Sequence, residues 1–149
     1  MTELYYEDLK VGQTFHSGTY EMTAERIKAF AAEYDPQPFH LDEARAKDSL
    51  FQGLAASGWH TAAVTMRLMI DSDLKLAGGS IGAGTEELRW PRPTRPGDVL
   101  RLEIAILEMR PSQSRPELGI VKTRLTTSNQ RGEPVQISRP TLMVRRRPA

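Results

Sequence analysis

The hydrophobic positions of this chain follow a helical period in its first half and a period of two in its second half. Residues 24–34 place apolar side chains three and four positions apart after Thr23, an N-cap residue, which predicts an amphipathic helix with one buried face. Residues 59–70 are apolar or small, with Arg67 as their one charge, which predicts a helix buried on nearly every side. This second segment is the expected central helix.

Alternating apolar and polar side chains predict half-buried strands over residues 99–106 and 121–126. Residues 129–132 have the composition of a hairpin loop, and Pro140 indicates a bulge or a sheet edge in the strand that returns from it. Several antiparallel strands together with one buried helix indicate a single α+β domain over residues 1–149, a sheet wrapped around a helix. The expected strands are residues 13–20, 99–106, 121–126 and 135–144.

Composition narrows the class of protein. The 149 residues are 26% charged and 39% hydrophobic with a net charge of +1, which fits one globular domain and does not favour a nucleic-acid partner. The basic residues 145–147 are a short tail that we expect to be a solvated terminus. No apolar run approaches the roughly 20 residues of a membrane span, and residues 1–4 lack the start of a secretory signal. We therefore expect a cytoplasmic protein that binds no membrane.

The segment 34–40 carries the clearest candidate chemistry. Pro36 and Pro38 fix their own φ and favour extended geometry in the preceding residues, so the helix before them must end there. Asp35 and His40 are thereby placed on a constrained turn, and a carboxylate with an imidazole is sufficient to handle the protons of a water molecule. The alternative is that Asp35 caps a turn and His40 packs at the surface.

This segment resembles the G-D-x-N-P-x-H signature of the MaoC-like dehydratases, and residues 53–58, 6–12 and 89–98 resemble other segments of that family. The resemblance implies a hotdog fold that pairs as a homodimer or a multiple of one. It also implies reversible (R)-specific hydration of trans-2-enoyl thioesters, usually esters of coenzyme A. We expect no cofactor other than the coenzyme A that belongs to the substrate.

Hydration adds water at Cβ while negative charge develops on the thioester oxygen. Asp35 is the candidate base, and His40 is expected to hold the same water and to return a proton at Cα. The N–H of Gly58, at the start of the central helix, is the candidate donor to the developing enolate. Glycine suits this position because a thioester must approach the backbone closely. The alternative for Gly58 is a tight turn into the helix.

The sequence departs from the family pattern at three positions. Tyr34 and Gln37 replace the Gly and Asn of the signature, and Met66 stands where related hydratases carry a serine, with Thr65 beside it. Methionine cannot donate a hydrogen bond, so Asp35, His40 and Gly58 are the residues whose roles carry over. The residues expected to contact substrate are Gln37, Ser57, Trp59 and Thr65.

Several nearby residues have structural interpretations. Ser57 is favoured as a helix cap over a substrate ligand, whereas Trp59, Met66 and Met69 suit the core or a tunnel wall. His60 is expected to be a core histidine bonded to a neighbouring backbone group rather than a catalytic one. Asp71 and Asp73 with His60 make no convincing ligand set, so we expect no metal. Four arginines suit either a solvated rim or the phosphates of coenzyme A: Arg92, Arg95, Arg110 and Arg115.

Two other functions compete with hydration. An acyl-CoA thioesterase of the same fold usually carries an acidic residue on the central helix, and residues 59–70 contain none. A non-catalytic protein that binds acyl thioesters would not need Asp35 and His40, and both are present. Hydration is therefore the favoured function.

Overall fold

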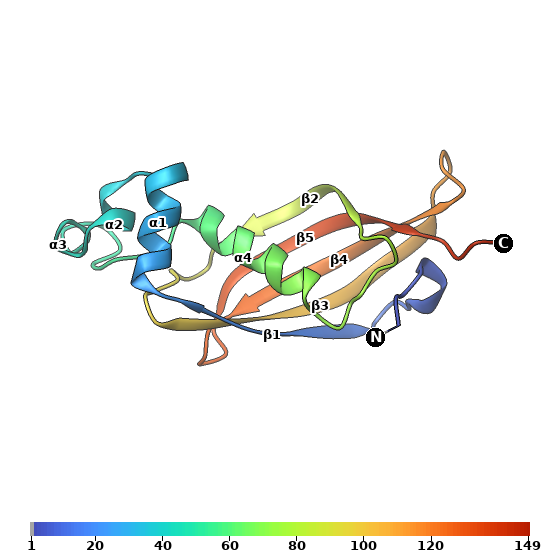
Figure 1. Ribbon diagram of the computed structural model, residues 1–149, viewed down its shortest axis with the longest axis horizontal. Helices are drawn as coiled ribbons and strands as arrows, with labels where there is room; N and C mark the ends of the chain where they lie inside the picture. The colour runs from blue at the N-terminus through green and yellow to red at the C-terminus, as the bar shows by residue number, and fades with distance from the viewer. Residues whose placement is uncertain (1) are drawn as a thin grey trace.

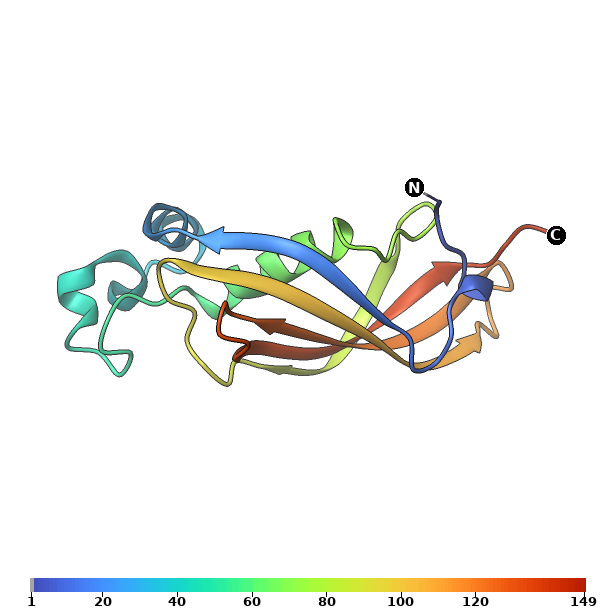
Figure 2. The same ribbon diagram turned by 90° about the horizontal axis from the view of Figure 1, so that it is seen from below.

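A computed structural model describes residues 2–149. Its strands form one antiparallel sheet in the order β1-β3-β4-β5-β2, and the helix α4 lies in the hollow of this curved sheet (Figures 1 and 2). This confirms the predicted α+β class, an antiparallel sheet around a long central helix. The strands are β1 (Thr14–Met22), β2 (Ile81–Arg89), β3 (Asp98–Pro111), β4 (Leu118–Ser128) and β5 (Pro134–Arg145). The helices are the 3-10 helix η1 (Tyr6–Asp8), α1 (Ala24–Tyr34), α2 (Pro38–Leu41), α3 (Glu43–Ala46) and α4 (Gly58–Ile70).

The core forms where α4 packs against β1, β3 and β5. Val64 and Leu68 of α4 are buried together with the apolar side chains that alternate along β3. Ile104 of β3 lies opposite Phe15 on β1 and Leu125 on β4. This register brings the apolar positions of neighbouring strands together on one face of the sheet. Each large apolar side chain buried in this way contributes about 1.5–3 kcal/mol to folding.

The helices α1, α2 and α3 gather at one end of the molecule, and the described ends of the chain lie at the other (Figures 1 and 2). Thr23 caps α1 as predicted, since its Oγ1 accepts a hydrogen bond from Arg26 N at 3.2 Å. The prolines end α1 at Tyr34, and Pro38 is the first residue of α2. A proline is tolerated there because the N–H of the first helical residue has no acceptor within the helix. His40 therefore lies on a short helix and Asp35 on the C-cap of the helix before it.

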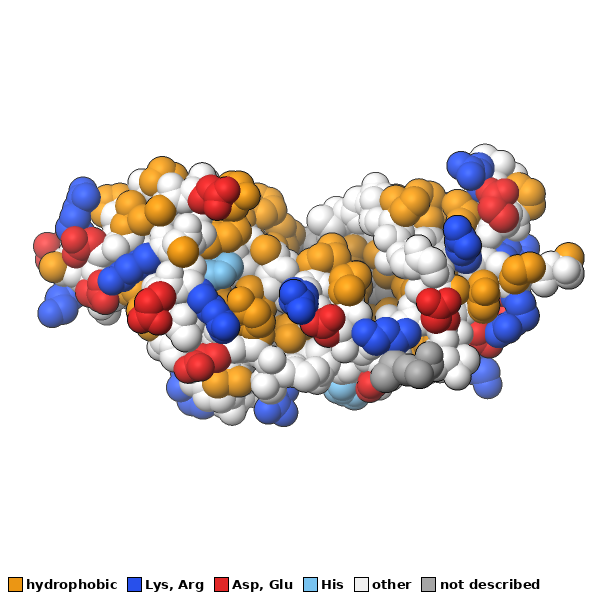
Figure 3. Space-filling model, viewed as in Figure 1, with side chains coloured by type: hydrophobic (Ala, Val, Ile, Leu, Met, Phe, Trp, Pro, Cys, Tyr) orange, Lys and Arg blue, Asp and Glu red, His pale blue; other side chains and the backbone are white. Residues whose placement is uncertain are grey.

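The central helix is less enclosed than its sequence predicts. Trp59, Met66 and Ile70 of α4 are 61, 53 and 52% exposed, and Figure 3 shows hydrophobic side chains gathered over this helix. The expectation of burial on nearly every side is wrong for the single chain, because the sheet covers only one side of α4. Met69, by contrast, lies in the core.

The strand β2 carries no clear alternation and is missed by the sequence pattern. It pairs with β5, so β5 is an internal strand, and the expectation of an edge at Pro140 is wrong. Pro140 faces Thr85, and the register of β2 shifts between Thr85 and Leu88. The irregularity expected from Pro140 thus lies in the strand opposite it, where a proline offers no N–H to the ladder.

The basic C-terminal tail is not merely solvated. Arg146 Nε lies 3.0 Å from a carboxylate oxygen of Glu7, and Arg147 bonds Asp8 at 2.6 Å, so the tail is tied to η1. None of the helices described in residues 2–149 is long and apolar enough to cross a membrane.

Candidate active site

Asp35 and His40 lie together at the end of the molecule where α1, α2 and α4 meet. His40 Nε2 is 3.4 Å from Asp35 Oδ2, and the side chains are 5% and 21% exposed. His40 Nδ1 is 2.6 Å from the carbonyl oxygen of Ala55. A carbonyl oxygen only accepts, so Nδ1 carries a proton and Nε2 is the nitrogen directed toward Asp35.

The Asp35 carboxylate is held on both oxygens. Gln37 Nε2 donates to Oδ1 at 2.5 Å, and Ser57 Oγ donates to Oδ2 at 2.7 Å. Burial by itself raises the pKa of Asp35. The two hydrogen bonds and the charge of His40 lower the pKa by more than burial raises it, so it lies below its usual value. Asp35 is therefore ionised at neutral pH and able to accept a proton.

Ser57 joins this pair to the start of α4. Its Oγ accepts a hydrogen bond from Trp59 N at 3.3 Å, so the cap role is confirmed, while its hydroxyl proton is directed to Asp35. Within the described residues, the next amide, Gly58 N–H, has no acceptor. Gly58 and His40 both line one open pocket of about 300 Å³.

The structure gives a reason for glycine at position 58 that the sequence did not indicate. A Cβ atom on Gly58 would lie 2.6–2.8 Å from three ring carbons of Trp90, so the indole occupies the space of a side chain, and the close approach of a thioester remains a prediction. Trp90 is fixed by a hydrogen bond from its Nε1 to Gln136 Oε1 at 2.9 Å and by edge-on contact with Trp59. No pattern in the sequence indicates this contact, because Trp90 follows the unpredicted strand β2.

We expect Gly58→Ala to destabilise the protein by about 1–3 kcal/mol, because the new methyl group must displace the Trp90 ring. Replacing Trp90 by leucine removes that obstacle, so the double variant should cost less than the sum of the two single variants by about 1 kcal/mol or more. Urea denaturation of the four proteins measures the coupling. Additive losses would show that Trp90 does not determine the glycine.

None of the four predicted substrate contacts is among the residues that line the pocket of His40 and Gly58. Gln37 and Ser57 both bond Asp35, whereas Trp59 lies beside Trp90 at the exposed start of α4. Thr65 is buried, and its hydroxyl oxygen lies 2.6 Å from that of Thr127, which joins α4 to β4. The Thr65 hydroxyl is thus committed to the core, and a substrate contact for it remains a prediction.

His60 is a core histidine, but the expected backbone partner is absent. Its ring stacks on Phe30 with centroids 4.6 Å apart, and within residues 2–149 its buried Nδ1 has no hydrogen-bond partner. The expectation of a bonded histidine is therefore wrong. Burial, with a smaller contribution from the charge of Arg26, lowers the pKa of His60 to about 4.

This shift predicts acid sensitivity. An unfolded histidine titrates near 6.5, so between about pH 6.5 and pH 4 the unfolded chain binds more protons, and stability falls as the pH falls. The full contribution of His60 is about 3 kcal/mol. Urea denaturation at pH 7 and pH 4.5 should show a smaller difference in His60→Phe than in wild type. The matched control is His16→Gln, at an exposed position, which should retain the wild-type difference; a retained difference in His60→Phe would contradict the prediction.

The four arginines have separate surroundings. Arg92 lines the pocket of His40 and lies 3.4 Å from Glu133, whereas Arg115 bonds Glu117 and Arg110 borders a different cavity. Arg95 belongs neither to a solvated rim nor to a site for the phosphates of coenzyme A. Its guanidinium donates to the carbonyl oxygens of three residues: Phe51, Gly53 and Leu54.

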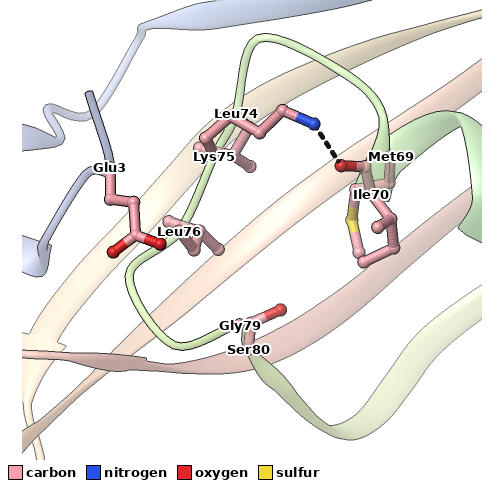
Figure 4. A pocket seen from close by; sticks show the side chains of 8 residues that line it. All are labelled: Glu3, Met69, Ile70, Leu74, Lys75, Leu76, Gly79 and Ser80. Carbon is pink, nitrogen blue, oxygen red and sulfur yellow. Dashed lines mark hydrogen bonds between the residues drawn. The ribbon is translucent and has the colours of Figure 1, made fainter. Parts of the chain in front are cut away.

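A second cavity of about 300 Å³ lies at the other end of α4 (Figure 4). Its lining is mostly apolar, its carboxylate is Glu3, and Lys75 bonds the carbonyl oxygen of Ile70 at 2.9 Å. This cavity has no carboxylate–imidazole pair beside it, so the pocket lined by His40, whose Nε2 faces Asp35, is the candidate active site. In the described part of the chain, no group of three His, Cys, Asp or Glu side chains is placed to hold a metal ion.

The fold and the site define a hotdog protein with a carboxylate–imidazole pair at the start of its central helix. Residues 8–129 match the model of the MaoC like domain, and the chain belongs to the MaoC-like family. A relative 35% identical over 127 residues is the uncharacterized protein YdeM of Bacillus subtilis, with 84% of this chain and 87% of that protein covered. A 3-hydroxybutyryl-CoA dehydratase of Methylorubrum extorquens is 28% identical over 117 residues, which cover 78% of this chain and 72% of that protein.

Solved structures show the same architecture. The MaoC-like dehydratase of Rhodospirillum rubrum is 59% identical with a TM-score of 0.94, and the match covers 98% of this chain and 99% of that one. The R-hydratase PhaJ1 of Pseudomonas aeruginosa is 28% identical with a TM-score of 0.80, covering 97% of this chain and 88% of that one. These likenesses agree with the hotdog fold that the sequence predicts.

Proposed function

We propose that the protein catalyses the reversible addition of water to a trans-2-enoyl-CoA, which gives an (R)-3-hydroxyacyl-CoA. The observation that carries the proposal is the Asp35–His40 pair, whose His40 lines a pocket that Gly58 also lines. Membership of the MaoC-like family supports the reaction type, and the names of two relatives, an R-hydratase and a 3-hydroxybutyryl-CoA dehydratase, support the product configuration and the thioester.

In this proposal one water molecule lies beside the pair and hydrogen-bonds both Asp35 and His40. Asp35 takes a proton from the water as its oxygen bonds Cβ, and the electron pair of the double bond moves toward the thioester oxygen. The proton on Asp35 passes to Nε2 across the 3.4 Å between them, and His40 then gives this proton from Nε2 to Cα. The pair thereby ends each turnover in its starting charge state, with the hydroxyl group and the proton added to one face of the substrate.

The N–H of Gly58 would receive the thioester oxygen. It lies on the first residue of α4, where the partial positive charge of the helix N-terminus adds to its own dipole. A donor of this kind acts where negative charge develops, and its loss typically costs about 3 kcal/mol of transition-state stabilisation. Gln37 and Ser57 would serve the reaction indirectly, by orienting the base.

The decisive experiment mixes the protein with crotonyl-CoA and follows the ultraviolet absorbance of the conjugated enoyl thioester. Loss of that band without release of free thiol supports hydration, and chiral chromatography of the 3-hydroxy acid tests the (R) configuration. Release of thiol would indicate an acyl-CoA thioesterase instead. Binding without either change, over acyl chains of several lengths, would indicate a non-catalytic protein and would contradict the proposal.

We propose further that a second copy of the chain covers the open side of α4. The exposed apolar side chains of this face run from Trp59 to Ile70, which also borders the second cavity. The strand β2 pairs on one side only, and an unpaired sheet edge is a site for association. A homodimer, or a multiple of one, would bury both features. Light scattering at the concentration of the assay measures this, and a fully active monomer would contradict it.

A further inference from the structure

The loop before the central helix is held by one partly buried group of hydrogen bonds. Arg95 lies between β2 and β3, and its Nη1 donates to the carbonyl oxygens of Gly53 and Leu54 at 3.0 and 3.2 Å. Its Nη2 donates to the carbonyl oxygen of Phe51. A guanidinium offers five N–H donors in a rigid plane, so a single side chain can bind three backbone oxygens in fixed relative positions.

The clamped loop contains a strained residue. Gln52 has a φ of 57°, the left-handed region that residues with a Cβ avoid, and a conformation of this kind costs about 1–3 kcal/mol. It persists where the surroundings determine the backbone on both sides. Here the carbonyl groups of Phe51 and Gly53, on either side of Gln52, are both bound by Arg95. Arg95 therefore stabilises a loop shape that the chain would not adopt by itself.

The residue that follows the clamped segment is the partner of His40. Ala55 accepts the hydrogen bond from His40 Nδ1, and its own N–H donates to Phe39 O at 3.1 Å. Arg95 is in turn fixed by its backbone N–H, which donates to a buried carboxylate, Asp98 Oδ2, at 2.8 Å. A continuous set of contacts thus runs from Asp98 through Arg95 and the loop to the imidazole.

We propose that Arg95 is a positioning residue for the hydration reaction. It fixes residues 51–54 so that the Ala55 carbonyl holds His40 with Nδ1 protonated and Nε2 turned toward Asp35. This inference rests on the proposed function for its catalytic consequence. Its structural part, the tautomer and orientation of His40, is independent of any activity. Arg95 itself need not touch the substrate, since its guanidinium is committed to the loop.

The first test is the tautomer of His40. The chain has three histidines, so imidazole ¹⁵N spectra at alkaline pH are readily assigned with His16→Gln and His60→Phe. We expect the Nδ1–H form for His40 in wild type and a mixture containing the Nε2–H form in Arg95→Met. Arg115→Met, at an exposed arginine remote from the loop, is the matched control and should leave the spectrum unchanged. A wild-type His40 spectrum in folded Arg95→Met would overturn the proposal.

The second test separates positioning from general destabilisation. Misplacing a catalytic group by about 1 Å can cost about 100-fold, so Arg95→Met should lose about 10- to 100-fold in kcat on crotonyl-CoA, with a smaller change in KM. Arg95→Lys should restore little, because an ammonium cannot span three carbonyls, whereas added ethylguanidinium should restore part of the kcat of Arg95→Ala. An unchanged kcat in these variants would contradict the inference. If wild type itself hydrates no enoyl thioester, the proposed function fails, and the tautomer test still decides the role of Arg95.

Discussion

Replacing Asp35 by asparagine is expected to lower the turnover of crotonyl-CoA by at least about 100-fold, because it removes the base and leaves the shape of the side chain unchanged. The fold should tolerate the change. Ser57 can still donate to the amide oxygen, and the exposed Gln37 can turn its own amide so that its oxygen accepts from the new NH₂ group. The measurement is kcat in a protein whose thermal midpoint is compared with that of wild type.

The matched control for this prediction is Asp71→Asn. Asp71 is an exposed carboxylate at the C-cap of α4, where it pairs with Arg67, so the same chemical change there should leave turnover near the wild-type value. Turnover near wild type in Asp35→Asn would remove the role of Asp35 as base. A loss of turnover in the Asp71 variant as large as that at Asp35 would point to stability rather than proton transfer.

The second large effect is expected at His40. Asparagine at this position offers an amide N–H close to where Nδ1 lies, so His40→Asn should keep the bond to the Ala55 carbonyl while removing Nε2. Turnover should fall by at least about 100-fold with little change in stability. His40→Ala should lose activity similarly, and it should also lose about 1–3 kcal/mol of stability because the Ala55 carbonyl is left unpaired.

Asp35 and His40 act on one water in this mechanism, so their losses should not multiply. The variant that combines Asp35→Asn with His40→Asn is expected to lose far less turnover than the product of the two single losses. Rates measured on crotonyl-CoA for the wild type, both single variants and the double variant give this comparison directly. Fully multiplicative losses would show that the two residues assist separate steps.

The sequence by itself determined the elements whose pattern is local. The helical spacing of residues 24–34, the Thr23 cap and the prolines after Tyr34 predicted α1 and its end, because caps and φ restrictions act between neighbours in the chain. Alternation predicted most of β3 and β4, because one face of each strand meets the core, and the hairpin loop at residues 129–132 predicted β5 as the returning strand. The segment 34–40 likewise predicted that Asp35 and His40 act together, since only five positions separate them.

Only the tertiary structure decided the features that join distant segments. The contact of Trp90 with Gly58, the clamp of Arg95 on the loop before α4 and the bond of Thr65 to Thr127 all link residues 32 to 62 positions apart. No local pattern encodes such pairs. The periodicity of apolar positions predicts which face of a helix or strand a side chain occupies, but it does not predict which distant residue contacts that side chain. The exposed face of α4 was likewise decided by the tertiary structure. An apolar helix predicts burial, whereas the sheet of one chain covers a single side of it.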